Sequence, residues 1–450
     1  MKLSDKCFGA YDIRGIYPSE VNEELAYKIG RAFVTFLGAK RVAVGHDIRL
    51  SGPSISEALI KGLREAGCDA VDIGQCGTEM IYFATAHLNL DGGIMVTASH
   101  NPKNYNGMKL VREGARPISR DTGLRDIEKL VMAGDFPPPK KTPGKVEHID
   151  ITDEYVEHIL SYIDVKALKP LTVVANTGNG AGGPIVAALK KRLPVEVIPV
   201  FAEPDGNFPN GVPNPLLVDN RDVTAKAVLE AKADLGFAWD GDFDRCFLFD
   251  EKGEFIEGYY MVGFLAQAFL QKEPGAKIIY DPRMTWNTLE IVKEMGGTAV
   301  MCKSGHAFIK ERMRQENAIY GGEMSAHPYF REVSFFDSGM LVFLLVMELV
   351  SKAGKPLSAL IGERMAKFPC SGEINSTVKD AAAILAALEK EYGARGTVNK
   401  VDGLSVEFPQ WRFNLRLSNT EPVIRLNVET RGDKALLREK TDELLAKIRV

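Results

Sequence analysis

The sequence predicts an α/β protein with three related α/β domains, each a mixed sheet sandwiched by helices, and a smaller C-terminal α+β domain, all around a central cleft. Three observations predict it. One pattern of strand, loop, helix and strand occurs three times, Pro-rich or turn-forming segments separate the copies, and the C-terminal tail lacks the pattern. With 450 residues, the chain exceeds the ~250–300 residues at which single cores stop growing, so several domains are expected.

The repeated pattern is a β-branched strand, a loop containing Gly or Asp, an amphipathic helix and a second strand. It occurs at Arg41–Gly74, Leu171–Val200 and Ala276–Cys302. Each copy has the size of a βαβ unit, which favours parallel or mixed sheets with helices on their faces. A further strand follows each copy and ends in a polar loop, with the sequences GIMVTASHN, DLGFAWDGDFDR and AIYGGEMSAH. Open α/β sheets bind ligands at the carboxyl ends of their strands, so we expect the three loops to meet in the cleft.

Helix-breaking and turn-forming segments set the expected domain boundaries, which give domains at residues 1–145, 146–252, 253–369 and 370–450. Pro137–Gly144 is polar and cannot continue a helix, Glu251–Glu254 forms a turn, and Phe368–Pro369 ends the third copy. The tail should contain a helix, a hairpin-like pair of strands and a closing helix, at Asp380–Tyr392, Trp411–Leu417 with Val423–Glu429, and Lys434–Ile448.

Composition excludes several classes of function. Lys and Arg total 56 against 60 Asp and Glu, a net charge of −4, so no overall positive field attracts nucleic acid or an anionic membrane. The six cysteines form no C-x-x-C pair, which argues against a disulfide framework or a zinc site and favours a reducing cytoplasm. The N-terminus has no apolar signal core, and the apolar run Met340–Met347 is too short to span a bilayer. We therefore expect a cytoplasmic protein with no nucleic-acid or membrane partner.

The segment Asp91–Pro102 is predicted to be a short apolar strand ending in a polar turn that leaves Ser99 and His100 exposed. Serine and histidine are ordinary turn residues, so a turn without chemistry is one interpretation. A hydrolase nucleophile and its base is another. The G-x-S-x-G elbow of such enzymes is absent, however, and a hydrolase triad leaves the acidic loop downstream unexplained.

That acidic loop places Asp240, Asp242 and Asp244 directly after the apolar strand Leu235–Trp239. Three carboxylates this close repel one another without a cation, and together they form the oxygen environment that Mg²⁺ requires. A solvated acidic turn is the alternative. An EF-hand is excluded because its sixth position must be Gly and is Arg245, and because strands flank the loop.

Two further segments suggest anion binding. Guanidinium, hydroxyl and amide donors that suit a phosphate dianion gather around one turn, although a surface hairpin with an Arg–Glu pair explains them equally well; they are Arg416, Ser418, Asn419, Thr420 and Arg425. Gly178–Gly183 matches G-x-G-x-x-G after a strand, which raises a nicotinamide-dependent oxidoreductase as an alternative from another class. The other two copies lack this fingerprint, which favours ordinary tight-turn glycines.

Four motifs occur together and in order: T-A-S-H-N-P-x-x-Y-N-G-M-K from Thr97, D-G-D-F-D-R from Asp240, G-E-M-S-A-H from Gly322 and R-L-S-N-T-E-P from Arg416. Their combination closely resembles the α-D-phosphohexomutase family over essentially the whole chain. Three more segments are similar to the bacterial phosphomannomutases of that family: Ala10–Gly15, Gly77–Phe83 and Glu113–Ser119.

The resemblance implies an enzyme that interconverts mannose 1-phosphate and mannose 6-phosphate through a 1,6-bisphosphate. Ser99 would be carried as a phosphoserine, with Mg²⁺ held by a phosphoserine oxygen, Asp240, Asp242 and Asp244, and with hexose 1,6-bisphosphate as activator. The four domains would then be a phosphoserine-loop domain, a metal-binding domain, a sugar-binding domain and a phosphate-binding C-terminal domain. The partner would be a hexose phosphate, and we expect a monomer or a weak homo-oligomer.

The resemblance also implies roles for individual side chains. Lys109 and His327 are candidates for proton transfer, and Arg245 and Lys109 would cancel charge on the phosphoryl oxygens. The remaining groups would surround the phosphoserine (Tyr11, Arg14, His100), contact the sugar (Arg283, His306, Glu323, Ser325) or hold the non-reacting phosphate (Arg416, Ser418, Asn419, Thr420, Arg425).

Sugar preference stays open at this point. Glucose and mannose differ only at C2, and nothing in Glu323–Ser325 visibly reads that carbon, so a dual-specificity phosphomannomutase/phosphoglucomutase is the nearest alternative. Arg283 stands where many dual-specificity relatives have lysine, and Met324 where phosphoglucosamine mutases usually have Gln. A sugar-phosphate binding protein without turnover is a further alternative.

Overall fold

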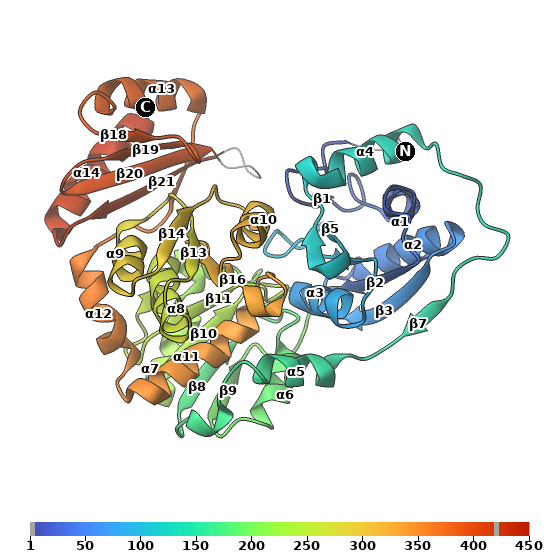
Figure 1. The fold of residues 1–450 in the computed structure, drawn as a ribbon, viewed down its shortest axis with the longest axis horizontal. Coiled ribbons are helices and arrows are strands. Elements are labelled where there is room, and N and C mark those ends of the chain that lie inside the picture. The colour runs from blue at the N-terminus through green and yellow to red at the C-terminus, as the bar shows by residue number, and fades with distance from the viewer. Residues whose placement is uncertain (1–4, 418–422, 450) are drawn as a thin grey trace. The chain divides into compact units, whose positions relative to one another are not determined.

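The computed structural model describes residues 5–417 and 423–449, which fold into two compact units (Figure 1). Unit 1 spans Met1–Phe255 and Tyr329–Gly354, and unit 2 spans Ile256–Pro328 and Lys355–Val450. Each unit contains two of the four sheets.

The first sheet of unit 1 has the strand order β1-β5-β4-β2-β3-β7, with β6 paired to β5. Its strands are β1 (Ile13–Ile16), β2 (Arg41–His46), β3 (Asp69–Gln75), β4 (Gly92–Val96), β5 (Tyr105–Arg112), β6 (Arg116–Pro117) and β7 (Val146–His148). Its helices are α1 (Glu23–Leu37), α2 (Gly52–Glu65), α3 (Thr78–His87) and α4 (Arg125–Ala133).

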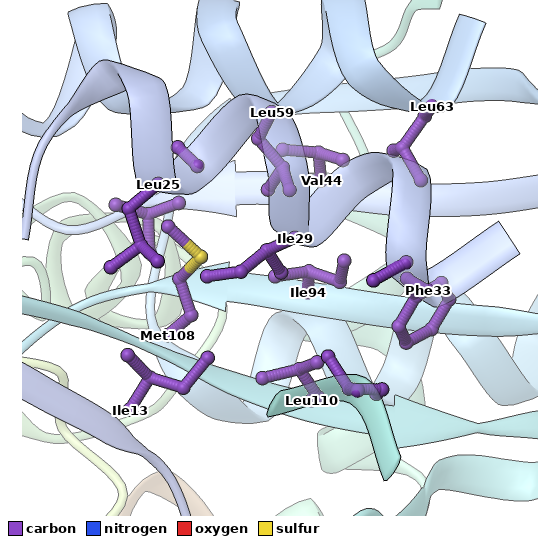
Figure 2. Packing of buried hydrophobic residues seen from close by; sticks show 14 of the residues in the cluster. Ile13, Leu25, Ile29, Phe33, Val44, Leu59, Leu63, Ile94, Met108 and Leu110 are labelled. Carbon is purple, nitrogen blue, oxygen red and sulfur yellow. The ribbon is translucent and has the colours of Figure 1, made fainter. Parts of the chain in front are cut away.

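Helix α1 illustrates how the sequence builds this layer. The Asn22 side chain accepts a hydrogen bond from the Leu25 N–H at the helix start, and Gly38 ends the helix with φ of 67°. A Cβ at Gly62 would lie 2.1 Å from the Tyr27 carbonyl oxygen, so only glycine allows α2 to approach α1 this closely. Figure 2 shows the resulting core, where Ile29 and Phe33 of α1 pack with Leu59 of α2 and with sheet residues such as Ile94.

The second sheet of unit 1 has the order β12-β11-β10-β8-β9. Its strands are β8 (Thr172–Asn176), β9 (Glu196–Val200), β10 (Leu235–Trp239), β11 (Cys246–Phe249) and β12 (Phe255–Ile256). Helices α5 (Thr152–Leu160), α6 (Gly183–Lys190), α7 (Asp222–Ala231) and α11 (Gly339–Ala353) also belong to unit 1. The apolar run Met340–Met347 lies in α11 and is buried. Within residues 5–417 and 423–449, no helix is both long and apolar enough to cross a membrane.

The third sheet has the order β14-β13-β15-β16, and the C-terminal sheet of unit 2 has the order β17-β21-β20-β19-β18. The strands are β13 (Lys277–Tyr280), β14 (Thr298–Met301), β15 (Tyr320–Gly322), β17 (Ile374–Thr377), β18 (Thr397–Asn399), β19 (Leu404–Glu407), β20 (Trp411–Leu417) and β21 (Val423–Thr430), while β16 (Pro328–Phe330) spans the unit boundary. The helices are α8 (Gly258–Lys272), α9 (Trp286–Glu294), α10 (His306–Glu316), α12 (Leu357–Lys367), α13 (Ala381–Tyr392) and α14 (Lys434–Ile448).

The threefold repeat is confirmed by strand pairing. In each copy the first strand is central: β2, β8 and β13 pair in parallel with β3, β9 and β14 on one side. On the other side they pair in parallel with β4, β10 and β15, the strands that end in the polar loops. The antiparallel neighbours β5 and β11 make the first two sheets mixed. The predicted fold class is therefore confirmed, and the central cleft stays a prediction.

Two details differ from or extend the predictions. Residues 137–144 contain no helix, yet β7 lies beyond the predicted boundary at residue 145 and pairs with β3 of the first sheet. The domain boundaries therefore stay predictions. In the tail, both helices and the β20–β21 hairpin are confirmed, whereas β17, β18 and β19 were not expected, because short segments such as Ile374–Thr377 carry no clear alternation of apolar residues.

Candidate active site

Ser99 lies three residues beyond β4, in a loop that closes on the acidic loop after β10. Its Oγ donates a hydrogen bond to Asp240 Oδ2 at 2.8 Å and lies 3.1 Å from His100 Nδ1. The expectation that Ser99 is exposed is wrong, because only 4% of the residue is accessible. Gly241 explains the burial: a Cβ there would lie 2.7 Å from the Ser99 carbonyl oxygen, so the absence of a side chain lets the two loops touch.

The acidic loop brings its three carboxylates together. Asp240, Asp242 and Asp244 are at most 1% exposed, and one carboxylate oxygen of each lies within 4.8 Å of those of the other two. Phe243, between them, has φ of 49° and is itself buried. A Cβ at Gly77 would lie 2.1 Å from its ring, so a glycine at the start of α3 makes room for it. Phe243 thus anchors the loop while the neighbouring aspartates converge.

Two cationic side chains lie within this acidic cluster. Lys109 Nζ is 2.7 Å from Asp242 Oδ2 and 2.6 Å from Asp244 Oδ2. Arg245 contacts Asp240 Oδ2 through Nε at 2.8 Å and Nη2 at 2.6 Å. Burial alone would lower the pKa of Lys109, but the two carboxylates outweigh it and the pKa lies well above its ordinary value. Burial likewise opposes ionisation of Asp242, but Lys109 outweighs it and holds that pKa below the ordinary value.

The cluster fits a hard divalent cation on two grounds. Its ligand atoms are carboxylate oxygens, the type that Mg²⁺ and Ca²⁺ prefer. In the described parts of the chain, Asp242 Oδ1 is buried and has no hydrogen-bond partner, and a buried carboxylate oxygen normally has one. Thr78, which the sequence did not single out, orients the same carboxylate: its Oγ1 donates to Asp242 Oδ2 at 2.5 Å. Such outer partners are typical of metal ligands.

The other predicted residues of unit 1 lie around the Ser99 loop. Arg14 donates to Asn101 Oδ1 at 2.7 Å, and its second nitrogen contacts Asp12 Oδ2 at 2.5 Å. Tyr11 is half-buried and lies two residues before β1. His100 Nδ1 is also hydrogen-bonded by Arg245 Nη2. Arg14, His100 and Arg245 are therefore brought to the loop that carries Ser99.

In unit 2, the predicted sugar-contacting residues gather at the carboxyl ends of β13 and β15. Arg283 Nη2 lies 3.4 Å from Glu323 Oε1 and 3.3 Å from Ser325 Oγ. Glu323 also accepts a hydrogen bond at 2.8 Å from the N–H of Gly305, the residue before His306 at the start of α10. The backbone N–H of Glu323 donates to the carbonyl oxygen of His327 at 3.0 Å, which fixes the turn between them. Arg283, His306, Glu323, Ser325 and His327 are thus brought together.

The predicted phosphate site is described in part. Arg416 of β20 and Arg425 of β21 are directly opposite in the sheet. Ser418, Asn419 and Thr420 lie outside the described residues. Arg425 Nη1 is 3.2 Å from Glu373 Oε1, and Arg416 Nη2 is 3.7 Å from Glu373 Oε2.

Glu373 is a residue that the sequence reasoning missed. Its Oε2 also lies 3.2 Å from Arg283 Nη1, so one carboxylate connects the sugar-contacting residues to the pair Arg416 and Arg425. Burial opposes its ionisation, but the guanidinium groups of Arg283, Arg425 and Arg416 outweigh it and lower the pKa of Glu373. No motif surrounds Glu373, and its partners are distant in sequence, so no local signal identifies it.

The glycines of Gly178–Gly183 have structural explanations. A Cβ at Gly183 would lie 1.8 Å from the Ala202 carbonyl oxygen, and Gly178 has φ of 59°. Ala181 N–H donates to the Gly241 carbonyl oxygen at 3.0 Å, so this loop supports the acidic loop beside Ser99. Close backbone packing accounts for the fingerprint without a dinucleotide.

Comparison with protein families gives four consecutive matches. The models are the phosphoglucomutase/phosphomannomutase α/β/α domain I at residues 5–137, domain II at 153–253, domain III at 257–368 and the C-terminal domain at 373–447. Together they cover most of the chain in one order.

Whole proteins match over nearly their full length. A phosphomannomutase of Salmonella montevideo is 59% identical over 446 residues, 98% of both chains. A protein of Xanthomonas campestris named "Phosphohexose mutases" is 59% identical over 438 residues, 97% of this chain and 98% of its own. Among solved structures, a phosphoglucomutase/phosphomannomutase family protein from Burkholderia thailandensis matches with a TM-score of 0.89 at 34% identity, covering 99% of this chain and 97% of that one.

Proposed function

The chain belongs to the phosphoglucomutase/phosphomannomutase family, and we propose that it is a phosphomannomutase, an isomerase that interconverts mannose 1-phosphate and mannose 6-phosphate. The observation that carries the proposal is the buried hydrogen bond from Ser99 Oγ to Asp240, within a cluster of three carboxylates and two cations. A serine in this setting suits a phosphoryl carrier, because transfer needs in-line positioning and cancellation of charge on the phosphoryl oxygens.

Ser99 is the proposed phosphoserine. Its phosphoryl group passes to whichever of the C1 and C6 hydroxyl groups of the hexose is not yet phosphorylated. This transfer breaks the bond between Ser99 Oγ and phosphorus and gives a hexose 1,6-bisphosphate. After the bisphosphate reorients, Ser99 Oγ accepts the other phosphoryl group, and the isomeric monophosphate leaves. A hexose 1,6-bisphosphate can also phosphorylate Ser99 at the outset, which makes it the expected activator.

Neighbouring side chains would stabilise the charge of the phosphoryl group and transfer protons during the reaction. Arg245 lies 3.5 Å from Ser99 Oγ and Lys109 lies in the same carboxylate cluster, so both would counter the charge of the phosphoryl oxygens. Mg²⁺ held by Asp240, Asp242, Asp244 and a phosphoserine oxygen would add a Lewis acid at the same place. Lys109 is the first proposed proton-transfer group, and Asp242 and Asp244 stabilise its ammonium form. His327 is the second proposed proton-transfer group, and Tyr11, Arg14 and His100 line the phosphoserine.

Substrate would be held by the residues of unit 2. Glu323 and Ser325 would contact sugar hydroxyls, and Arg283 and His306 would orient the ring. Arg416 and Arg425, with Ser418, Asn419 and Thr420, would bind the phosphate that does not react. We propose an enzyme that works in the cytoplasm as a monomer or weak homo-oligomer.

A dual-specificity phosphomannomutase/phosphoglucomutase is the second candidate. The name of the Xanthomonas campestris relative, at 59% identity, covers more than one hexose. Arg283 bears on the choice because it is bound to Asp281 by two hydrogen bonds of 2.9 Å. This planar, doubly held guanidinium presents a fixed edge to the sugar, which a mobile ammonium would not.

Turnover with purified protein tests the proposal. Mannose 1-phosphate, Mg²⁺ and a trace of hexose 1,6-bisphosphate should yield mannose 6-phosphate, followed by phosphorus NMR, and a chelator should stop the reaction. Failure to convert mannose 1-phosphate with all components present would contradict the proposal. Comparable turnover of glucose 1-phosphate in parallel would favour the dual-specificity candidate.

A further inference from the structure

Arg49, just after β2, directs its whole guanidinium group at the loop that contains Ser99. A guanidinium has five N–H donors. Nη2 donates to the carbonyl oxygens of Ser99 at 2.9 Å and Asn101 at 2.7 Å. Nη1 donates to those of Pro102 at 2.7 Å and Tyr105 at 2.9 Å. Nε contacts Asp47 Oδ2 at 3.3 Å, so the five donors are all used, three of them on the Ser99 loop and one on the first residue of β5.

The Ser99 backbone needs this support. Ser99 has φ of 48°, a left-handed conformation that non-glycine residues adopt infrequently and at a cost in energy. Arg49 binds the carbonyl group of Ser99, and the N–H of Ser99 donates to Thr97 Oγ1 at 2.8 Å. Both polar backbone groups of Ser99 are therefore fixed.

Asp47 joins the two supports. Its Oδ2 accepts a hydrogen bond from Thr97 Oγ1 at 2.6 Å, and its Oδ1 accepts one from the Arg49 N–H at 2.9 Å. The centroid of the Phe208 ring lies 5.4 Å from the guanidinium carbon of Arg49. Only 1% of Arg49 is exposed to solvent. Arg49 is thus enclosed, and its position is determined by its partners on every side.

We propose that Arg49 is a positioning residue for the phosphoserine: it holds Ser99 in the left-handed conformation that directs Oγ at Asp240. Without it, four carbonyl groups, including the buried one of Ser99, lose a donor. Ser99 can then relax to a negative φ, which turns its Cα–Cβ bond away from the carboxylate cluster. In the described part of the chain, the Arg49 guanidinium group contacts Asp47, the Phe208 ring and the carbonyl groups between Ser99 and Tyr105. It should therefore affect the rate of phosphoryl transfer and leave substrate affinity nearly unchanged. The inference rests on the proposed function.

The first experiment compares Arg49→Lys with the matched control Arg31→Lys. The ammonium group of lysine has three N–H donors and is not planar, so it cannot donate hydrogen bonds to four carbonyl groups at once. Arg31 is also buried, at 4% exposed, but its partners are Tyr27 Oη and the carbonyl oxygen of Pro137, away from Ser99. Measured well below the melting temperature of each variant, kcat of Arg49→Lys should fall about 10²-fold with KM within a few fold. Arg31→Lys should keep the wild-type kcat.

Two outcomes separate this inference from the proposed function. If wild-type protein converts mannose 1-phosphate and Arg49→Lys has the same kcat as Arg31→Lys, the inference about Arg49 is overturned while the proposed function stands. If wild-type protein converts no hexose phosphate, the proposed function fails and the inference falls with it.

A second pair of variants covers the case in which Arg49→Lys does not fold. Thr97→Val keeps the branched shape and removes the acceptor for the Ser99 N–H, whereas Thr97→Ser retains the hydroxyl group. We expect Thr97→Val to lose kcat with little change in KM, and Thr97→Ser to recover most of it. Equal kcat values for the two variants would overturn the inference, because the Ser99 backbone would then need no support.

Discussion

Lys109 Nζ lies 2.7 Å from Asp242 Oδ2, although the two residues come from different sheets of unit 1 and are 133 positions apart. Both are buried, and each holds the other in its charged form. Removing one partner of a buried ion pair is costly, because the other charge stays buried and uncompensated.

Lys109→Met should therefore destabilise the protein by about 3–5 kcal/mol when divalent cations are chelated. Mg²⁺ should restore much of that loss, because a cation would again neutralise the carboxylates. Urea unfolding with chelator and with Mg²⁺ measures both effects. Lys28→Met, which removes a surface pair with Glu24, is the control and should cost at most about 1 kcal/mol with no dependence on Mg²⁺. Similar behaviour of the two variants would contradict this account of the cluster.

Ser99→Ala should abolish turnover and leave hexose-phosphate affinity within a few fold. The hydroxyl is the proposed phosphoryl carrier, whereas the groups proposed to bind substrate are elsewhere. Calorimetric titration gives the affinity, and phosphorus NMR gives the turnover. Ser54→Ala, which removes a hydroxyl group of α2 that donates to Glu23 of α1, is a control expected to turn over normally. Unimpaired turnover by Ser99→Ala would rule out the phosphoserine.

Glu373→Gln should raise KM about tenfold or more for the hexose phosphate. Glu373 contacts Arg283, Arg416 and Arg425, and hydrogen bonds to charged groups contribute about 1.5–3 kcal/mol each, where about 1.4 kcal/mol equals tenfold in affinity. The neutral amide holds three guanidinium groups less firmly. Glu290→Gln, which removes a partly exposed partner of Arg364, is the matched control. Equal KM values for both variants would show that Glu373 does not position the arginines.

The buried carboxyl group of Glu79 should make the folding stability of the protein depend on pH. It lies in the first turn of α3 and accepts hydrogen bonds from Ser338 Oγ and, at 3.2 Å, from the Met340 N–H. Burial raises its pKa from 4.5 to about 8. Between these pH values the folded protein keeps a proton that the unfolded chain has lost, so this contribution to stability is complete below pH 4.5 and is lost as the pH rises through 8.

Glu79→Gln should remove that slope, which is at most about 1.4 kcal/mol per pH unit, and should be more stable than wild type above the raised pKa. The free energy of unfolding of both proteins, measured in urea across this range, gives the difference. Parallel pH curves for wild type and Glu79→Gln would show that Glu79 is not the group responsible.

The repeat and the chemistry of the loops could be predicted because they are local. A β-branched strand followed by a polar loop is visible within about ten residues, and so are the spacing of Asp240, Asp242 and Asp244 and the glycines around them. The confirmed pairing of β2, β8 and β13 with their neighbours follows from that pattern.

The supporting residues could not be predicted because their partners are distant in sequence. Arg49 is 50 positions from Ser99, and Glu373 is 90 from Arg283. Neither belongs to a recognisable motif, and each acts through a contact that exists only after folding. The burial of Ser99 was missed for the same reason, since it depends on the approach of Gly241 from another sheet.

Phosphorylation of Ser99 itself tests the central claim most directly. Protein incubated with hexose 1,6-bisphosphate and Mg²⁺ should gain one phosphoryl group, which mass spectrometry of the peptide containing Ser99 would locate. Mannose 1-phosphate or mannose 6-phosphate, added afterwards as the acceptor, should then remove the phosphoryl group from that peptide. A Ser99 peptide that stays unmodified while mannose 1-phosphate is converted would contradict the phosphoserine mechanism.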